Sequence, residues 1–276
     1  MESFRHMPLE NIQNCRDLGG YPIKGGGFTK YGRLLRCGRP RASTPSDMEF
    51  FREYGIKNVF DLRGDSEAIS MPSEFADYPG VNYYHFSLLE INPASPHMEM
   101  SMPEVYVTSL NECKGNYARL FSALSRVDAP SMFHCFLGKD RTGITAALIL
   151  HLTGVYFEDI VADYRISSTY LEPFYRREME RKTGLVHESD MSHLGSPSEN
   201  ITAVFEYLSR RYGCVFLNAA IRVDKHNLIA KYAIQYSDKY FQQQNPPSGN
   251  PGGGLTCSYV DYSDARKVSV SVISAS

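Results

Sequence analysis

Short apolar runs between glycine- and proline-containing turns predict strands that alternate with helices along the first two thirds of the chain. Residues 56–62, 81–88 and 129–135 are short apolar runs typical of buried strands. Residues 14–37 hold short β-type pieces separated by glycines, which predicts a β-hairpin region. This alternation of strands and helices predicts an α/β fold with a parallel sheet at its centre.

Capping residues mark the first predicted helix. Thr44 is a favourable N-cap, Pro45 suits the first helical position, and Gly55 ends the helix. A second helical pattern covers residues 104–125, where we expect helix in the second half.

The remaining helices follow the third predicted strand. Residues 141–155 form an apolar pattern that ends at Gly154, and residues 156–184 predict one or two helices. Ser196 and Glu199 have the spacing of a capping box and predict another helix start. The last predicted helix spans residues 224–241.

A change in composition divides the chain. We expect a main domain over residues 1–243, a linker rich in proline and glycine over 244–254, and a tail over 255–276. The tail alternates polar and apolar residues, which is typical of a short β-hairpin. A strand added to the main sheet and a disordered tail are the alternatives, and the chain has no internal repeat.

Composition and charge narrow the function classes. The 276 residues are 42% hydrophobic and carry a formal net charge of −2, as in an ordinary globular protein. Nucleic acid is therefore not an expected partner, because its binding requires a basic excess. The six cysteines form no CxxC pair, so we expect no metal site, and we expect no cofactor. The sequence shows neither a signal-peptide core nor a transmembrane segment, which predicts a cytoplasmic protein, with signal-less export left open.

One segment, FHCFLGKDRTGI at residues 133–144, concentrates reactive and charged side chains between a predicted strand and a predicted helix. Cys135 would lie at the strand end, where a helix N-terminus and nearby cations favour the thiolate, which is the nucleophilic form. Arg141 and Lys139 supply those cations.

The same segment predicts a phosphate cradle. Backbone N–H groups of residues 136–141 can surround one tetrahedral anion, and Gly138 permits the sharp turn. Arg141 offers a planar fork that holds two phosphate oxygens, and the Thr142 hydroxyl can bond to the thiolate. The predicted phosphate-binding residues in the loop are Phe136, Leu137, Gly138, Lys139 and Thr142.

Asp140 is the candidate general acid. A carboxyl beside a thiolate and a phosphate dianion keeps its proton more readily, since like charges disfavour ionisation. It could protonate the leaving group and later accept a proton from the attacking water. Asp61 and Glu104 are reserves for this role.

Each of these residues also has a structural interpretation. A cysteine at a strand end is usually a small buried hydrophobe, and an Asp-Arg pair is usually a surface ion pair. A nucleotide-binding P-loop is excluded, because its G-x-x-x-x-G-K-[ST] pattern is absent. The combined spacing at a strand–helix junction favours the chemical interpretation.

The segment HCFLGKDRTG resembles the H-C-x5-R-[ST] signature of the cysteine-dependent protein tyrosine phosphatases, in its bacterial and fungal branch. The stretches NCRDLGGY, GRLLRCGRP and VFDLRGDSE are similar to further motifs of that branch, with Cys37 where serine is usual. The resemblance covers roughly residues 9–240. It implies a protein-tyrosine-phosphatase-like α/β fold: a mostly parallel central sheet flanked by helices, with an extra helical lid or C-terminal helices.

The resemblance also implies an activity. Members remove phosphate through a phosphocysteine, and the substrates would be phosphotyrosine proteins, with dual specificity or phosphoinositide activity associated with Lys139 and Asp140. The tyrosine phosphatases with a W-P-D loop carry their acid there, but this chain has no tryptophan. In this branch the acid is the loop aspartate. A phosphate-binding pseudo-phosphatase and a related thiol-dependent anion enzyme are the alternatives.

Other matched positions have two interpretations each. Asp61 and Arg63 would either orient the loop or substrate or form an ion pair that fixes the fold. Asn14, Arg16 and Asp17 are predicted to be structural, in a hairpin network beside the site.

Two further predictions concern residues around the nucleophile. His134 is predicted to hold the loop by hydrogen bonds. A disulfide from Cys15 or Cys37 to Cys135 would protect or switch the enzyme.

Overall fold

The structure is a computed structural model that describes most of the chain up to residue 212. The described residues are 5–89, 97, 99–184 and 195–212, together with the backbone of three strand segments at 233–234, 256–261 and 266–271. None of the helices in these ranges is both long enough and apolar enough to span a bilayer.

Five strands form the central sheet in the order β1-β3-β6-β4-β5. β3, β6, β4 and β5 are parallel neighbours, and only β1 runs antiparallel, against β3. The prediction of a mostly parallel α/β sheet is therefore confirmed. The strands are β1 (Arg16–Asp17), β3 (Leu34–Cys37), β4 (Asn58–Asp61), β5 (Asn82–His85) and β6 (Ser131–His134).

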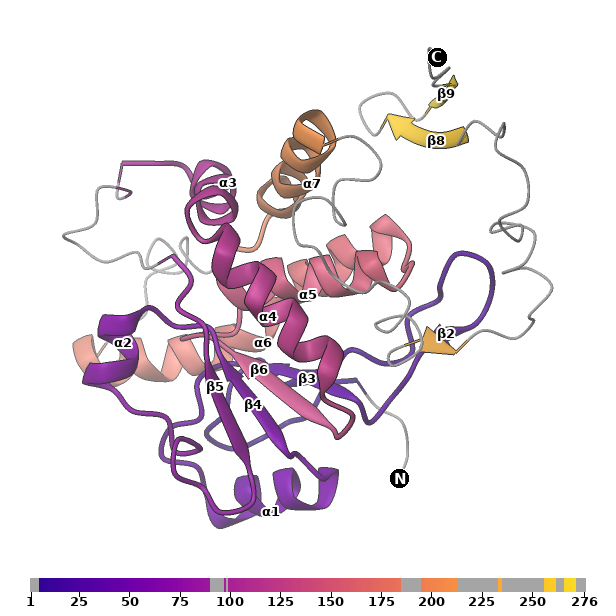
Figure 1. The fold of residues 1–276 in the computed structure, drawn as a ribbon. Helices are drawn as coiled ribbons and strands as arrows, with labels where there is room; N and C mark the ends of the chain where they lie inside the picture. Colours follow the sequence, from indigo (N-terminus) through magenta and orange to yellow (C-terminus); the bar gives the residue numbers. More distant parts are fainter. Residues whose placement is uncertain are drawn as a thin grey trace.

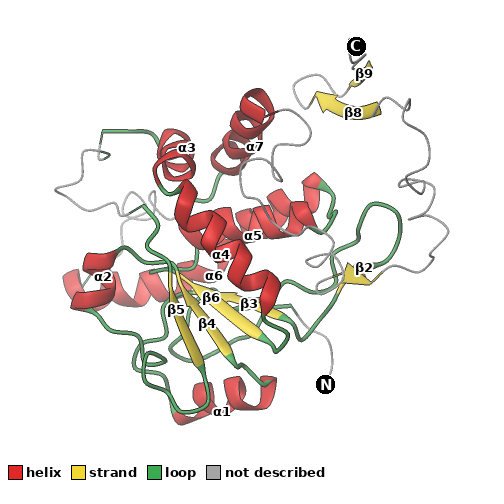
Figure 2. Cartoon of the chain, in the orientation of Figure 1, coloured by secondary structure: helices red, strands yellow, loops and turns green. Residues whose placement is uncertain are grey.

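Helices cover both faces of this sheet, with α1 on one side and α4 and α5 on the other (Figures 1 and 2). Two short strand pairs, β2–β7 and β8–β9, lie outside the central sheet. The helices are α1 (Pro45–Tyr54), α2 (Asp65–Ser70), α3 (Met102–Glu112), α4 (Lys114–Arg126), α5 (Asp140–Leu152), α6 (Phe157–Thr183) and α7 (Ser198–Tyr212).

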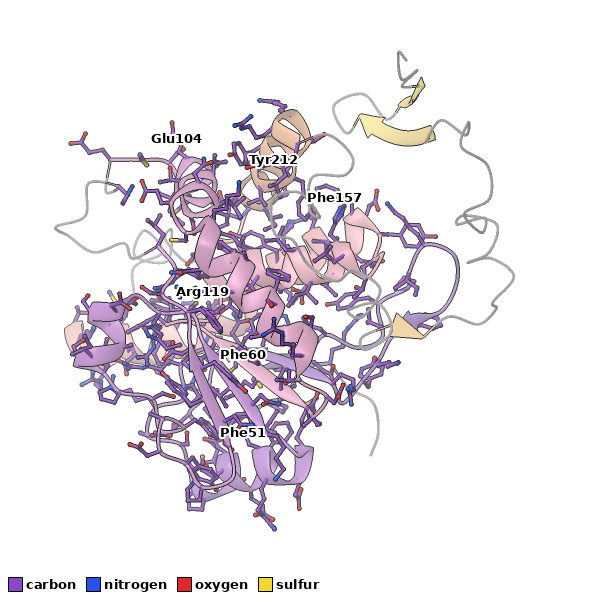
Figure 3. The ribbon with its side chains drawn as sticks, viewed as in Figure 1. Phe51, Phe60, Glu104, Arg119, Phe157 and Tyr212 are labelled. Carbon is purple, nitrogen blue, oxygen red and sulfur yellow. The ribbon has the colours of Figure 1, made fainter. Side chains whose placement is uncertain are left out.

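Strand alternation divides the core into two clusters. Successive side chains of a strand point to opposite faces, so Val59 packs with Phe51 of α1, whereas Phe60 packs into the larger cluster beneath α4 and α5. In Figure 3, Phe51 lies toward α1 and Phe60 toward α4. Both faces of β3, β4 and β6 are therefore buried, whereas the edge strand β5 is partly exposed.

The first helix forms as predicted. Thr44 accepts a hydrogen bond from the backbone N–H of Asp47 and Gly55 adopts the left-handed conformation at the C-cap. The prediction for residues 104–125 was wrong in its first half, since α3 and α4 make nearly the whole range helical. The cause is a cap outside that range: the Ser101 backbone N–H donates to Glu104 at 2.8 Å.

Of the two later helices, one agrees with its prediction and one differs. α6 is a single helix of 27 residues, which is one of the two predicted alternatives. α7 begins at Ser198, and the Ser196 hydroxyl is engaged by α6, where it donates to the Arg165 carbonyl and accepts from the Ser168 N–H, in place of the predicted capping box.

Strand pairing replaces part of the last predicted helix. β7 (Ala233–Ile234) pairs antiparallel with β2 (Phe28–Thr29), and such tertiary pairing overrides helix propensity. The rest of residues 224–241 lies outside the described residues. In the tail, β8 (Thr256–Asp261) and β9 (Arg266–Ser271) form the expected hairpin as a separate two-stranded sheet. The proposed domain boundaries stay a prediction.

Candidate active site

The predicted reactive loop lies between the central strand β6 and helix α5. β6 is paired with β3 on one side and β4 on the other, and His134 stands level with Cys37 and Asp61. Cys135 follows directly and is 3% exposed, while α5 begins at Asp140. The fold thus presents the thiol at the end of a rigid strand, in front of a helix N-terminus, where anions are favoured.

The carbonyl groups of the loop are bound from outside it. Asn14 Nδ2 donates to the carbonyls of Leu137 and Gly138 at 3.2 and 2.9 Å, and the Arg39 N–H donates to the Phe136 carbonyl at 2.9 Å. In a trans peptide the carbonyl and the following N–H point in opposite directions. The N–H groups that follow these carbonyls are therefore turned toward the interior of the loop, as an anion cradle requires.

Gly138 allows this loop to lie against the neighbouring strand. Its φ is +68°, a conformation that side chains disfavour. A Cβ atom there would lie 2.4 Å from the carbonyl carbon and oxygen of Cys37. Both the torsion and the close approach require glycine.

A buried ion cluster of Arg16, Arg36 and Asp163 is hydrogen-bonded to the loop through the Gly138 carbonyl. Arg36 Nη2 donates to the Gly138 carbonyl at 2.8 Å, and its Nη1 pairs with Asp163. Arg16 Nε bonds the other carboxylate oxygen of Asp163 at 2.8 Å, and the Tyr21 hydroxyl donates to the same oxygen at 3.0 Å. Burial opposes ionisation of Asp163, but the two arginines outweigh it and hold its pKa well below the usual range. Burial, with Arg16 nearby, lowers the pKa of Arg36 to about 10, so Arg36 stays protonated at neutral pH.

The loop opens into a pocket of 320 Å³ that contains the predicted nucleophile, acid and arginine. Cys135, Asp140 and Arg141 all line it. The two terminal nitrogens of Arg141 both bond the carboxylate of Glu67 in α2, with Nη2 at 2.9 Å. Burial disfavours both charges, yet this pairing raises the pKa of Arg141 and lowers that of Glu67. Glu67 thus binds the edge of the guanidinium formed by Nη1 and Nη2. The other edge, formed by Nε and Nη2, can bind an anion.

Asp140 ends a chain of buried hydroxyl groups. The Tyr106 hydroxyl donates to Asp140 Oδ1 at 2.5 Å and lies 2.7 Å from the Tyr164 hydroxyl. Because the single Tyr106 proton is donated to Asp140, Tyr164 donates to Tyr106, and Asn200 Nδ2 in turn donates to Tyr164 at 3.0 Å. Burial and Asp140 raise the pKa of Tyr106 well above its usual value, so Tyr106 keeps its proton and orients the carboxyl.

The sequence itself matches a known family. Residues 7–230 fit the sequence model of the Tyrosine phosphatase family. The chain belongs to the tyrosine phosphatase family. It is therefore an enzyme of the protein tyrosine phosphatase class.

Two named sequence relatives agree with this assignment. A putative tyrosine-protein phosphatase of Cupriavidus necator is 32% identical over 193 residues, which are 66% of this chain and 70% of that protein. The triple specificity protein phosphatase PtpB of Mycobacterium tuberculosis is 29% identical over 166 residues, which are 48% of this chain and 60% of that protein. A PTP-like phytase from Bdellovibrio bacteriovorus superposes on 82% of this chain and 95% of that chain, with 14% identity and a TM-score of 0.36.

In this tyrosine phosphatase, Asp61 and Arg63 lie behind the loop and do not line the pocket. Both side chains are fully buried, and Arg63 Nη2 bonds Asp61 at 2.6 Å. Burial raises the pKa of Asp61, but His134 and Arg63 outweigh it and hold the pKa well below the usual range. The pair therefore fits the interpretation as a fold-fixing ion pair. His134 Nδ1 lies 3.1 Å from the Cys135 carbonyl, as expected for a residue that holds the loop.

Lys139 and Thr142 do not line the pocket either. Lys139 Nζ donates to the Gly195 carbonyl at 3.2 Å and lies 3.7 Å from Asp140 Oδ1. The Thr142 hydroxyl is buried and has no hydrogen-bond partner among the described residues, so its bond to the thiolate stays a prediction. Glu104, a reserve acid, caps α3 at the surface instead, and Figure 3 shows it at the end of that helix.

The other two buried cysteines of this region pack on the far side of the sheet from Cys135. Cys15 and Cys37 lie together in the cluster on the α1 side. Cys135 packs in the cluster on the opposite side, and all three are free thiols. A disulfide needs Cα atoms within about 7 Å and Cβ atoms that face each other, so this arrangement weighs against a bond from either cysteine to Cys135.

The site also contains residues that were not predicted from sequence, among them Glu67, Tyr106 and Asp163. Glu67 was visible as the last residue of the matched stretch VFDLRGDSE, but nothing in that stretch indicates Arg141 as its partner. Tyr106 and Asp163 carry no local signal, because their roles depend on how helices pack against the loop.

Proposed function

We propose that this protein removes phosphate from phosphotyrosine residues of proteins through a phosphocysteine on Cys135. The observation that carries the proposal is the cradle: the loop carbonyls are bound from outside, and its N–H groups surround a pocket lined by Cys135, Asp140 and Arg141.

Two displacements at phosphorus follow from this placement. The Cys135 thiolate attacks phosphorus, an S–P bond forms, and the ester P–O bond breaks as Asp140 gives its proton to the departing tyrosine oxygen. Water then attacks phosphorus, Asp140 accepts a proton from that water, and the S–P bond breaks to release inorganic phosphate and the thiolate. Tyr106 holds the Asp140 carboxyl in place for both transfers.

Groups of the protein itself stabilise the negative charge that develops on the phosphate in the transition state. Backbone N–H groups of the loop and the Nε–Nη2 edge of Arg141 face the equatorial oxygens, and donors fixed before the reaction stabilise such charge most effectively. Glu67 keeps the Arg141 fork from rotating away from them.

The pocket walls favour an aryl phosphate. Leu89, Val105, Ile144 and Phe136 line the pocket and provide apolar contact for an aromatic ring. Lys139, which the resemblance associates with phosphoinositides, does not line it. Phosphotyrosine is therefore the substrate that this pocket suits best.

Hydrolysis of p-nitrophenyl phosphate in the presence of EDTA is the first test. We expect turnover by the wild type, loss of turnover in Cys135→Ser, and a kcat lower by about 10²- to 10⁴-fold in Asp140→Asn. Cys113→Ser is the matched control, because Cys113 lies outside the pocket lining and should leave the rate unchanged. Rapid quenching followed by intact-protein mass spectrometry should detect phosphate on Cys135, and full activity in Cys135→Ser would reject the mechanism.

A substrate panel tests the specificity. We expect kcat/KM to be highest for phosphotyrosine peptides, above phosphoserine and phosphothreonine peptides and phosphoinositides. Binding of phosphotyrosine peptides without turnover would favour a pseudo-phosphatase instead.

A further inference from the structure

A second hollow, of 480 Å³, lies beside the catalytic pocket and shares a wall with it. Phe136 and Leu137 line both spaces. Phe136 is 40% exposed and stands where the two spaces meet. A substrate that places phosphate over Cys135 would therefore extend past Phe136 into this second hollow.

Four arginines line the second hollow, against one glutamate. Arg39 and Arg41 come from the segment after β3, and Arg177 and Arg181 stand one turn apart on α6. The glutamate is Glu178, which bonds Arg181 at 3.0 Å. The segment after β3 and helix α6, which are far apart in the sequence, thus both place arginines in the second hollow.

Three of the four arginines have no acidic partner among the described residues. Within the described ranges, no carboxylate forms an ion pair with Arg39, Arg41 or Arg177. Arg39 is only 9% exposed, and its guanidinium lies 4.8 Å from the ring centre of Phe136. Burial lowers the pKa of Arg39, and the nearby charges of Arg63 and Arg41 act in the same direction.

The backbone that carries Arg41 is held in an unusual conformation. The next residue, Ala42, has a φ of +50°, and Asn11 Nδ2 donates to its carbonyl at 2.6 Å. Non-glycine residues with positive φ are uncommon and tend to occur where a local geometry is required. Here the turn fixes the rim of the basic hollow.

From this geometry we propose that the hollow lined by Arg39, Arg41, Arg177 and Arg181 is a subsite for a second anionic group on the phosphopeptide, an acidic or phosphorylated residue beside the phosphotyrosine. The proposal rests on the proposed function for the identity of the first phosphate. Arginine suits this task because its fork binds carboxylate and phosphate in the same bidentate way.

Matched peptides test the subsite. One peptide carries glutamate on both sides of phosphotyrosine, a second carries a neighbouring phosphoserine, a third carries glutamine and a fourth carries lysine. For the wild type we expect kcat/KM for the two anionic peptides to exceed that for the glutamine peptide by about 10-fold, mainly through KM. The difference should shrink between 50 and 500 mM salt, because exposed charges are screened.

Charge reversal on α6 provides the decisive variant. In Arg177→Glu/Arg181→Glu the preference for anionic peptides should disappear and the lysine peptide should become the better substrate. The control is Arg52→Glu/Arg210→Glu, which makes the same change in net charge at exposed positions of α1 and α7 and should keep the wild-type preference.

The outcomes separate the two proposals. If the wild type hydrolyses p-nitrophenyl phosphate but treats all four peptides alike, the subsite is rejected and the proposed function stands. If turnover is absent, the proposed function fails, and binding of fluorescent peptides to Cys135→Ser, measured by anisotropy, still tests the subsite. The proposal would also be overturned if Arg177→Glu/Arg181→Glu changed kcat/KM for inositol phosphates but not for the peptides.

Discussion

Replacement of Gly138 by alanine tests whether the loop shape depends on a contact with the neighbouring strand. Alanine at a φ of +68° costs about 1–2 kcal/mol from the left-handed torsion alone. The new Cβ would also lie 2.4 Å from the Cys37 carbonyl group and 2.6 Å from the Gly38 nitrogen. These are backbone atoms that no rotamer change can move, so overpacking adds about 1–3 kcal/mol. We therefore expect Gly138→Ala to lower the free energy of unfolding by about 2–5 kcal/mol.

Gly184 provides the matched control, because it separates the torsion from the contact. Its φ is +73°, and a Cβ there would meet nothing within 4 Å. Gly184→Ala should therefore lose about 1–2 kcal/mol from the torsion and keep full activity. Urea unfolding of both variants, followed by circular dichroism, measures the difference.

Activity gives a second measure of the same change. A shift of the Gly138 carbonyl away from Asn14 and Arg36 would turn the cradle N–H groups, and a misplacement of about 1 Å can lower kcat by about 10²-fold. If Gly138→Ala is as stable as Gly184→Ala and retains wild-type kcat, the loop does not depend on its contact with Cys37, and the reasoning is refuted.

Three further variants test the groups around the loop. Glu67→Gln should lower kcat/KM by roughly 10- to 100-fold in p-nitrophenyl phosphate assays, because Arg141 loses its charged partner; an unchanged value would remove Glu67 from the site. Asp163→Asn should destabilise the protein by about 3–5 kcal/mol at pH 7. Because the folded pKa of Asp163 is depressed, its contribution is present above the unfolded value of about 3.9 and is lost as pH falls below it, so the wild-type advantage in urea unfolding should narrow toward pH 3. Tyr106→Phe should lower kcat with little change in KM, because the Asp140 carboxyl loses the hydrogen bond that orients it; a change in stability alone would contradict the orienting role.

The parts of the site that could be predicted from sequence are those that follow from local order. Cys135, Asp140 and Arg141 lie within seven residues at a strand–helix junction, and the chain cannot separate them in space. Thr44 and Gly55 likewise fix α1 through contacts within the helix itself.

The parts that could not be predicted depend on long-range packing. Glu67 is 74 residues from Arg141, and Asp163 is 127 residues from Arg36. Neither separation leaves a pattern in a single sequence, because both pairings arise only after the helices dock on the sheet. The same reason explains the error at residues 233–234, where pairing with β2 replaces a helical pattern.

The buried ion cluster also explains why the cradle suits an anion. Two guanidinium groups, of Arg16 and Arg36, share the single carboxylate of Asp163, so the cluster keeps an excess positive charge. Arg36 conveys that charge directly to the loop through its bond to the Gly138 carbonyl. A fixed positive charge in a region of low dielectric acts more strongly than one in water. The supporting cluster therefore both orients the loop and favours an anion inside the cradle.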